Sequence, residues 1–456
     1  MRFTRLPYRE DSADLFDAIA GEPWSVFLDS GRPGATGGRW DILASRPHAT
    51  LTTSGDHTRI ETRSGVLVSE EDPLVLLKEW LGRAESSGAF PFAGGAIGYF
   101  SYDLARRLGE LSATGKDADG LPDMAVGLYD WALLVDHETR ATHLVSAGRD
   151  SQTGRDWEQL IELFSHPVPT DRADWTVLAG PESNLPWPRY RQALDRAQRY
   201  IAEGDCYQIN LTQQFTASVR GSRWQLYRAL RRINPAPFGA YLNHPAAQVL
   251  SSSPERFIEL RGDRASTRPI KGTRPRGADP ESDRALAAEL LASAKDRAEN
   301  LMIVDLLRND LGKVCRTGSV TVPGLFELES FANVHHLVST ITGTLMPGRD
   351  ALDLLRATFP GGSITGAPKR RAMAIIDELE PHRRGLYCGA IGYIGCNGDM
   401  DSNIAIRTLV SQGESIRFGV GGGIVADSVA KLEYQECLDK AAPMLRLLKP
   451  PTDGFV

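Results

Sequence analysis

The chain has 456 residues, of which 41% are hydrophobic and 24% are charged, so it can bury a large core and is long enough for more than one lobe. Its net charge of -6 and the spread of arginines along its length argue against nucleic-acid binding. No apolar run approaches the roughly 18 residues that span a bilayer, and the first residues carry charges where a signal peptide needs an apolar core. We therefore expect a cytoplasmic protein that does not contact a membrane.

Short β-type runs separated by turns dominate the first part of the chain, where helical periodicity is scarce. The clearest of these runs are residues 24–28, 40–43, 49–53 and 126–135. The segment 146–186 is rich in Asp, Pro, Ser and Gly, which is typical of a connection between lobes. We expect a mostly β N-terminal lobe over residues 1–170 and a second, catalytic lobe over residues 180–450, with a soft boundary between them.

A basic segment holds Lys271 among Arg268, Arg274 and Arg276. Neighbouring guanidinium groups disfavour the ammonium form of a lysine, so we expect a neutral amine that can act as a nucleophile. Gly272 allows the backbone to approach a ligand closely. The alternative interpretation is a solvated basic turn.

The position of Lys271 relative to Glu255 depends on a predicted hairpin, whose two strands are joined across Gly262-Asp263. A three-residue loop at 262–264 places Glu255 opposite Lys271 and so sets a carboxylate beside the amine. A two-residue loop places Ile270 opposite Glu255 and turns Lys271 to the other face of the sheet.

Three helices have recognisable N-terminal signals. Asp279-Pro280 begins one helix, and Ser293 caps a second that extends to about Leu311. A C-terminal helix is expected to be capped by Asp427 or Ser428.

Pairs of carboxylates lie on two of these helices. Such pairs suit a hard, oxygen-liking cation such as Mg2+. A solvated first turn and a surface ion pair explain the same spacing, so the spacing alone leaves both interpretations open. The residues are Asp296 and Glu299 on the second helix, and Glu433 and Glu436, followed by Lys440, on the C-terminal helix.

Two glycine-rich stretches, 361–369 and 419–423, are expected to form anion-binding loops. Exposed N–H groups at a helix start or in a glycine run bind anions. His336 lies on a β-type run and is either a proton donor or a hydrogen-bonded core residue.

Together these features resemble the chorismate-utilising enzymes, the family of anthranilate synthase component I, aminodeoxychorismate synthase component I and the isochorismate and salicylate synthases. The resemblance covers nearly the whole chain and implies an α/β fold of the α+β type. In that fold two large antiparallel β-sheets pack as a sandwich with flanking helices, and the two lobes intermingle. The motifs that carry the resemblance are 253–257, 269–277, 295–312, 336–339, 361–369, 387–393, 406–408 and 421–440.

Two positions separate the chemistries within this family. Isochorismate and salicylate synthases carry a water-activating lysine where this chain has Gln208, so ammonia is the implied nucleophile. Lys271 stands where anthranilate synthases typically have alanine, and it matches the members that aminate chorismate at C4. The resemblance thus implies Mg2+-dependent formation of 4-amino-4-deoxychorismate, for para-aminobenzoate and folate synthesis, through a covalent lysine adduct at C2. The rival interpretations are an anthranilate synthase component I, which would release pyruvate, and a chorismate-binding scaffold subunit without turnover.

The resemblance also implies roles for individual residues. Lys271 would be the nucleophile, Glu255 the general acid and base, and His336 a group near the departing hydroxyl. Glu299 and Glu436 would bind Mg2+, supported by Asp296 and Glu433. Substrate contacts would come from Gln208, Gly272, Thr273, Thr365, Tyr387, Arg407, Gly421, Gly422, Gly423 and Lys440.

The five cysteines bear on the source of ammonia. They are an odd number without a CxxC pair, which favours reduced thiols over a disulfide framework or a zinc site. None lies in the Gly-x-Cys-x-Gly elbow of class I amidotransferases. The resemblance therefore implies a separate glutamine amidotransferase subunit that passes ammonia to this chain through an internal path.

A second ligand site is implied near the N-terminus. Leu28-Asp29-Ser30 matches the family's Leu-Glu-Ser effector motif, with Asp in place of Glu. Ser30 and Arg39 could therefore form a tryptophan site, although feedback control does not follow from it.

Overall fold

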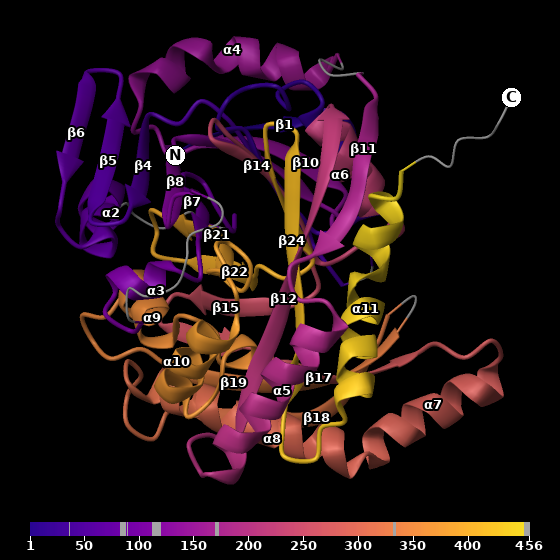
Figure 1. Cartoon of the computed structure of the whole chain (residues 1–456). Helices are drawn as coiled ribbons and strands as arrows, with labels where there is room; N and C mark the ends of the chain where they lie inside the picture. Colours follow the sequence, from indigo (N-terminus) through magenta and orange to yellow (C-terminus); the bar gives the residue numbers. More distant parts are fainter. Residues whose placement is uncertain are drawn as a thin grey trace, which may run out of the picture.

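Two large β-sheets form the body of the protein (Figure 1). The computed structural model describes residues 1–35, 37–82, 88, 90–111, 120–168, 173–331 and 334–450. Each sheet has 12 strands. Among the described residues, all pairings between named strands are antiparallel, which confirms the predicted fold class.

The strand order of each sheet follows. In the first sheet it is β1 (Arg2–Leu6), β10 (Ala141–Ser146), β9 (Trp131–Asp136), β3 (Trp40–Ala44), β2 (Val26–Asp29), β13 (Phe238–His244), β14 (Ala247–Ser253), β23 (Thr408–Gln412), β24 (Ser415–Ile424), β12 (Gln208–Gly221) and β11 (Trp175–Ser183), with β20 (Gly366–Ala367) also paired to β12. In the second sheet it is β17 (Ile270–Pro275), β19 (Val334–Thr344), β16 (Arg264–Thr267), β15 (Arg256–Arg261), β22 (Met400–Ile404), β21 (Ala390–Gly395), β7 (Gly95–Phe100), β8 (Met124–Tyr129), β4 (Ala49–Ser54), β5 (His57–Thr62) and β6 (Gly65–Ser69), with β18 (Thr321–Ser330) also paired to β19.

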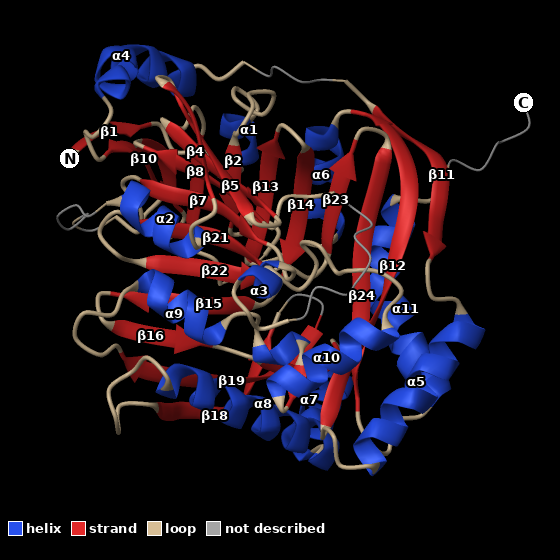
Figure 2. Cartoon of the chain, turned by 60° about the vertical axis from the view of Figure 1, so that its left-hand side comes forward, coloured by secondary structure: helices blue, strands red, loops and turns tan. Residues whose placement is uncertain are grey.

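The helices lie around the sheets (Figure 2). None of the described helices is both long and apolar enough to cross a membrane. The helices are α1 (Ala13–Phe16), α2 (Pro73–Leu81), α3 (Leu104–Arg107), α4 (Ser151–Ser165), α5 (Trp187–Ala202), α6 (Arg223–Ile233), α7 (Pro280–Ala292), α8 (Ala294–Gly312), α9 (Ala351–Thr358), α10 (Lys369–Leu379) and α11 (Ala430–Leu447), together with the short 3-10 turn η1 (Gly362–Ile364).

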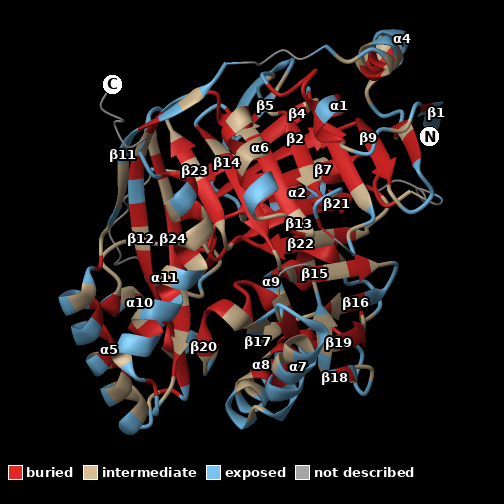
Figure 3. Ribbon diagram, turned by 90° about the vertical axis from the view of Figure 1, so that its right-hand side faces the viewer, coloured by how far each residue is buried: buried red, intermediate tan, exposed pale blue. Residues whose placement is uncertain are grey.

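Three apolar clusters hold the two sheets and their helices together. One lies between the sheets, where Ile42 of the first packs with Ile97 and Ile391 of the second. A second cluster joins the first sheet to α4, α5, α6, α10 and α11. The third joins the second sheet to α2, α8 and α9. Figure 3 shows the result, with largely buried strands and with exposed outer faces on α5 and α11.

Both sheets contain strands from both sides of the expected lobe boundary, since β2 pairs with β13 and β7 with β21. The segment 146–186 is not a plain connection, because the 15-residue helix α4 buries Trp157, Leu160 and Phe164 against the first sheet. Residues 169–172, at the predicted boundary, lie outside the described residues.

Most local predictions hold, and two are wrong. Asp279 and Ser293 cap α7 and α8 as expected. The run 126–135 is two antiparallel strands, β8 and β9, separated at Asp130. The residue at the N-cap of α11 is Val429, while the Ser428 hydroxyl instead accepts from the Val425 N–H.

Candidate active site

Lys271 lies in a β-bulge. Ile270 is opposite Val338 on β19, but Thr273 is opposite His336, so β17 contains one extra residue at this point. Gly272 has a φ of +85°, and a Cβ added there would approach the Asp296 side chain to 3.0 Å. Glycine is therefore needed for the bulge to lie against the start of α8.

The hairpin before the bulge has the two-residue loop, because Arg261 pairs with Arg264. The three-residue register that would set Glu255 directly opposite Lys271 is therefore wrong. The chain nevertheless brings them together, since β16 and Ile270 of β17 pair with β19 in one register and the bulge between Ile270 and Thr273 then shifts that register by one residue. Lys271 and Glu255 are close enough for each charge to affect the pKa of the other.

The amine of Lys271 contacts groups from two other elements, one of which is held in turn by a third. Its Nζ lies 3.0 Å from Oε1 of Glu299 on α8 and donates to the carbonyl of Ser363 in η1 at 3.3 Å. Gln208, the first residue of β12, donates from Nε2 to the same Glu299 oxygen at 3.0 Å. The Gln208 amide therefore steadies the carboxylate that holds the lysine.

These carboxylates keep Lys271 protonated in this structure. Burial lowers the pKa of Lys271, but the Glu299 carboxylate and the nearby Glu255 outweigh burial and leave that pKa above its ordinary value. The expectation that neighbouring arginines would favour the neutral amine is wrong, because those arginines pair with other carboxylates: Arg268 with Glu329, Arg274 with Glu289 and Asp296, and Arg276 with Asp283.

Two oppositely charged groups, the buried Glu255 and the half-buried Arg407, lie close enough for the charge of Glu255 to affect the pKa of Arg407. Burial raises the pKa of Glu255, although a hydrogen bond from Ser363 and the charge of Lys271 oppose that rise. Burial lowers the pKa of Arg407, and the charge of Glu255 opposes it. Within the described part of the chain, the Arg407 guanidinium makes neither an ion pair nor a hydrogen bond. A cation in that state suits an incoming carboxylate.

His336 is a neutral imidazole at pH 7. Burial, assisted by the charge of Arg407, lowers the pKa of His336 to about 4. Its Nδ1 lies 2.9 Å from the Thr273 hydroxyl. Thr365, by contrast, turns its hydroxyl into its own loop and donates to the carbonyls of Gly361 and Gly362.

The glycine run 419–423 is part of strand β24 and not a loop, so that prediction is wrong. Gly421, Gly422 and Gly423 pair with β12. Because glycine has no side chain, these positions leave room for the side chains of neighbouring residues. A Cβ at Gly423 would lie 2.0 Å from Gln208 Nε2 and 2.9 Å from Glu299 Oε1, and a Cβ at Gly419 would lie 2.3 Å from the ring of Tyr387.

Three of the predicted metal ligands, Glu299, Glu433 and Glu436, converge on β24, whereas Asp296 lies beside Gly272 of β17, and all four are paired with another group. A Cβ at Gly422 would lie 3.6 Å from Glu433 and 3.9 Å from both Glu436 and Lys440, beside the Gly423 position that Glu299 approaches. Among the residues that the structure describes, no three potential ligands are assembled for a metal. The pairs are Glu299 with Lys271, Asp296 with Arg274 at 3.2 Å, Glu433 with Ser428 at 2.8 Å and Lys295 at 3.8 Å, and Glu436 with Lys440 at 2.6 Å.

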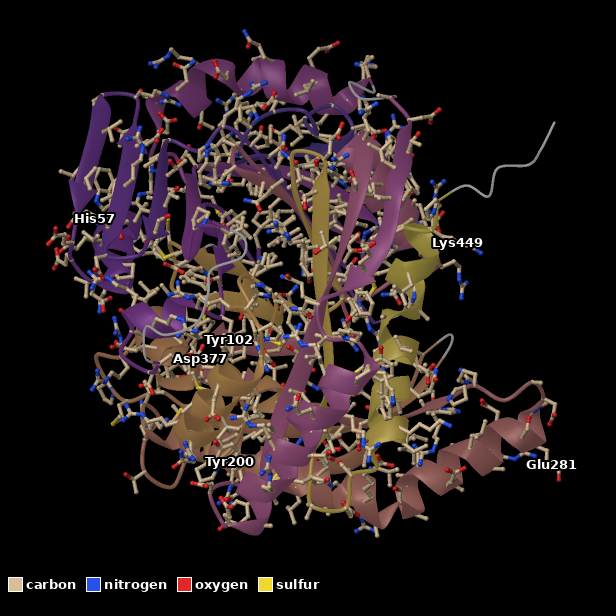
Figure 4. All side chains as sticks on the ribbon, viewed as in Figure 1. His57, Tyr102, Tyr200, Glu281, Asp377 and Lys449 are labelled. Atoms are coloured by element: carbon tan, nitrogen blue, oxygen red, sulfur yellow. The ribbon has the colours of Figure 1, made fainter. Side chains whose placement is uncertain are left out.

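Sequence reasoning missed a buried ion pair, Glu380 and Arg384, behind the Ser363 loop. Arg384 donates from Nη1 to the Ile364 carbonyl at 2.8 Å and from Nη2 to Glu380 at 2.8 Å. Its guanidinium also lies 4.8 Å from the ring centroid of Tyr102, which Figure 4 labels in the middle of the molecule. The four-residue spacing of the pair was its only sequence signal, and surface pairs share that spacing.

Ser30 and Arg39 do not join this site. They line a separate cavity of about 340 Å3 between the sheets. Arg39 is held by Asp136 at 2.7 Å and Glu138 at 2.9 Å. The buried Ser30 hydroxyl has no hydrogen-bond partner among the described residues.

Comparisons with known proteins agree with this arrangement. The family model for chorismate binding enzymes matches residues 26–446. The aminodeoxychorismate synthase component 1 of Klebsiella aerogenes is 49% identical over 449 residues, covering 97% of this chain and 98% of that protein. Anthranilate synthase component 1 of Pseudomonas putida is 37% identical over 473 residues, covering 97% and 95%.

Solved structures agree as well. Anthranilate synthase component I from Streptococcus pneumoniae TIGR4 has a TM-score of 0.81 at 34% identity, covering 90% of this chain and 92% of that one. The isochorismate synthase MenF of Escherichia coli shares the fold, with a TM-score of 0.71 at 19% identity. The chain therefore belongs to the family of chorismate-binding enzymes, as its motifs predicted.

Proposed function

We propose that this chain catalyses the amination of chorismate at C4 with ammonia, forming 4-amino-4-deoxychorismate for para-aminobenzoate and folate synthesis. The observation that supports this most is the buried position of Lys271 beside Glu255 and Glu299. Relatives that are 46% to 49% identical over almost the whole chain are named aminodeoxychorismate synthase component 1.

The reaction proceeds by two displacements. Lys271 gives a proton to Glu255, and its neutral amine attacks ring carbon C2 while Glu255 returns the proton to the departing C4 hydroxyl, which leaves as water. Ammonia then attacks C4 and expels the lysine as a neutral amine, and the product carries the new ammonium group. The raised pKa of Glu255 suits a carboxyl group that must hold a proton before giving it up.

Other residues orient the substrate. Arg407, which has no ion-pair partner among the described residues, binds a substrate carboxylate. The rest of the substrate site is lined by Tyr387, Gly421, Gly422 and Lys440. Gln208 favours ammonia over water, because an amide is not a base at neutral pH and cannot activate water as the lysine of isochorismate synthases would. The neutral His336 can donate an N–H hydrogen bond to the departing hydroxyl.

The donor set fits a Mg2+ ion, since it consists of carboxylates that approach adjacent positions of β24 from two helices. Glu299 and Glu436 would hold the ion, with Asp296 and Glu433 beside them. When bound, Mg2+ would neutralise charge and orient the ring carboxylate of the substrate.

The ammonia is supplied by a glutamine amidotransferase subunit. Two features support this: the relatives are named as component 1, and the five cysteines of this chain are all buried and lie outside any amidotransferase elbow.

The cavity at Ser30 and Arg39 is a second ligand site, and tryptophan is its ligand. The unpartnered Ser30 hydroxyl favours this assignment. Isothermal titration with tryptophan tests it: binding by the wild type that is lost in Ser30→Val supports the assignment, and the absence of binding overturns it.

Product analysis tests the main proposal. The purified chain is incubated with chorismate, Mg2+ and an ammonium salt, and the products are separated by chromatography with mass detection. Aminodeoxychorismate without pyruvate, absent for Lys271→Ala, is the expected result. Without ammonia, the mass of the wild-type chain should increase by that of chorismate less one water. Anthranilate with pyruvate would identify the rival synthase, and no turnover would favour the scaffold subunit.

A further inference from the structure

Lys271 and Glu299 belong to different elements, so their contact depends on how those elements are held together. Lys271 lies on β17 and Glu299 on α8, and the amine and the carboxylate meet at 3.0 Å. The ladder between β17 and β19 does not fix Lys271 directly, because its register shifts between Ile270 and Thr273. Apolar packing under α8 is not directional and does not set such a distance by itself. A directional contact between the elements is therefore needed.

Ser339 and Asn300 supply a directional contact. Ser339 on β19 donates from Oγ to Oδ1 of Asn300 on α8 at 2.6 Å, and both residues are fully buried. Asn300 follows Glu299 in the helix, and its Nδ2 also donates to the Leu337 carbonyl on β19 at 3.4 Å. The Asn300 amide thus binds β19 at two places. Figure 2 shows α8 alongside β18 and β19.

The backbone of Ser339 connects the same point to the strand of the lysine. Its N–H donates to the carbonyl of Pro269 at 3.3 Å, two residues before Lys271. Ser339 therefore binds the chain that enters β17 through its N–H, and the helix that carries Glu299 through its hydroxyl.

The Ser339 hydroxyl is also held from β18. Phe326, in a bulge of that strand, donates its N–H to Ser339 Oγ at 3.1 Å. Phe326 has a φ of +59°, which bulky residues rarely adopt and which persists only where the surroundings hold it. Arg297, one turn of α8 before Asn300, lies 5.0 Å from the centroid of the Phe326 ring. Because Ser339 Oγ accepts from Phe326 and donates to Asn300, the two bonds strengthen each other.

A second link between β17 and α8 is more open to water. Arg274 and Asp296 form an ion pair at 3.2 Å, but the Arg274 side chain is 25% exposed and also binds Glu289 at 2.8 Å. Ion pairs that water can reach contribute little to stability. The buried bond between Ser339 and Asn300 is therefore better suited to fix the position of α8.

We propose that Ser339 and Asn300 are positioning residues, whose buried hydrogen bond sets the distance between the Lys271 amine and the Glu299 carboxylate. Both side chains are fully buried and bonded to each other, so they act on the reaction only through the elements that they join. The catalytic consequence rests on the proposed amination of chorismate, whereas the distance itself does not.

Three variants test the proposal: Ser339→Ala, Asn300→Leu and the double variant that combines them. Leucine has the same branched outline as asparagine but cannot hydrogen-bond. In metal-free crystal structures of each variant, the distance from Lys271 to Glu299 should exceed that in the wild type. With ammonium as substrate, kcat should fall by up to about 10²-fold, as expected for a misplaced reacting group. The KM for chorismate should change little.

The double variant separates position from stability. Removing both partners of a buried hydrogen bond costs less than removing one, because no polar group is left unpaired. The double variant should therefore unfold at a higher temperature than Asn300→Leu, while its kcat stays as low as that of the single variants.

The matched control is Thr342→Val, also on β19. The Thr342 hydroxyl is hydrogen-bonded to that of Thr321 at 3.1 Å, which joins β19 to β18 and not to α8. This variant should keep the kcat of the wild type even if its unfolding temperature falls.

Two results would overturn the proposal: a distance from Lys271 to Glu299 in the double variant equal to that of the wild type, or a kcat that recovers together with stability. A wild type without turnover would contradict the proposed function alone, and the crystal structures would then decide the positioning role.

Discussion

Arg384 donates a 2.8 Å hydrogen bond to the carbonyl of Ile364, the residue next to Ser363, on whose carbonyl the Lys271 amine rests. Arg384 is only 5% exposed, so this bond is shielded from water. The Arg384 side chain therefore determines where the Ser363 loop lies relative to the catalytic lysine.

Replacing Arg384 with lysine should impair catalysis more than folding. The variant keeps a positive charge beside Glu380 but cannot reach Ile364 and Glu380 with the same fork of donors. A displacement of the loop by about 1 Å would lower kcat by roughly 10²-fold. Steady-state kinetics with ammonium, together with thermal unfolding, would measure both effects.

The control for that experiment is Arg106→Lys. Arg106 is also held in ion pairs, with Asp103 at 2.8 Å and with Asp377 on α10, and neither of these partners belongs to the Ser363 loop. Its kcat should stay near that of the wild type even if its unfolding temperature falls. Equal losses of kcat in the two variants would mean that Arg384 acts only on stability.

Adjacent glycines of β24 should respond differently to alanine. In Gly423→Ala the new methyl group would displace the Gln208 amide, which lies 2.0 Å from its position, and so break the hydrogen bond to Glu299. The displaced group is the end of a flexible side chain, so stability should change little while kcat falls. In Gly422→Ala the nearest atom is 3.6 Å away, so any effect should be confined to KM.

Measurement of kcat and KM for Gly422→Ala and Gly423→Ala would test this predicted difference. A Gly423→Ala enzyme with unchanged kcat would show that the Gln208–Glu299 bond is not needed for turnover.

Removing the Glu299 carboxylate should make Lys271 easier to deprotonate. Burial lowers the pKa of Lys271 and Glu299 raises it, so in Glu299→Gln burial is less opposed and the pKa falls. In metal-free protein, Lys271 should then react with an amine-acylating reagent at lower pH, as followed by peptide mass spectrometry. Glu329→Gln, which removes the partner of Arg268, is the control and should leave the labelling profile unchanged.

Two buried histidines should remain neutral far below the usual pH. Burial lowers the pKa of His336 and of His244 to about 4, from an ordinary value of 6.5. Between these values the unfolded chain binds protons that the folded chain does not, so the free energy of unfolding falls as the pH drops from 6.5 towards 4. The loss is on the order of 3 kcal/mol for each histidine, since one pKa unit corresponds to about 1.4 kcal/mol.

Proton NMR would report the ring titrations directly. Midpoints near 6.5 for these two histidines would contradict the burial argument.

The sequence predicted the features that depend on neighbouring residues. Asp279 and Ser293 bond to backbone N–H groups two or three residues away, so their caps were readable from spacing. Asp296 and Glu299 share a face of α8 because of the helical period. The motifs also identified the family, since they combine into a pattern that few folds contain.

Features that depend on distant partners were not readable in this way. The pKa of Lys271 follows from Glu299, and the neighbouring arginines are occupied by carboxylates such as Glu329 from elsewhere in the chain. The relation of Glu255 to Lys271 depends on where β17 pairs with β19, more than 60 residues further along. Spacing within the hairpin could not decide that pairing.

The strand order has a consequence for synthesis of the protein. β23 and β24 lie inside the first sheet, between β14 and β12, yet they are among the last strands in the chain. Until residues 408–424 have left the ribosome, β14 and β12 are two open edges that can pair with the wrong strands. The first sheet therefore cannot be completed until synthesis is nearly finished. A product truncated before β24 would leave both edges open to aggregation. It would also lack α11, which carries Glu436 and Lys440.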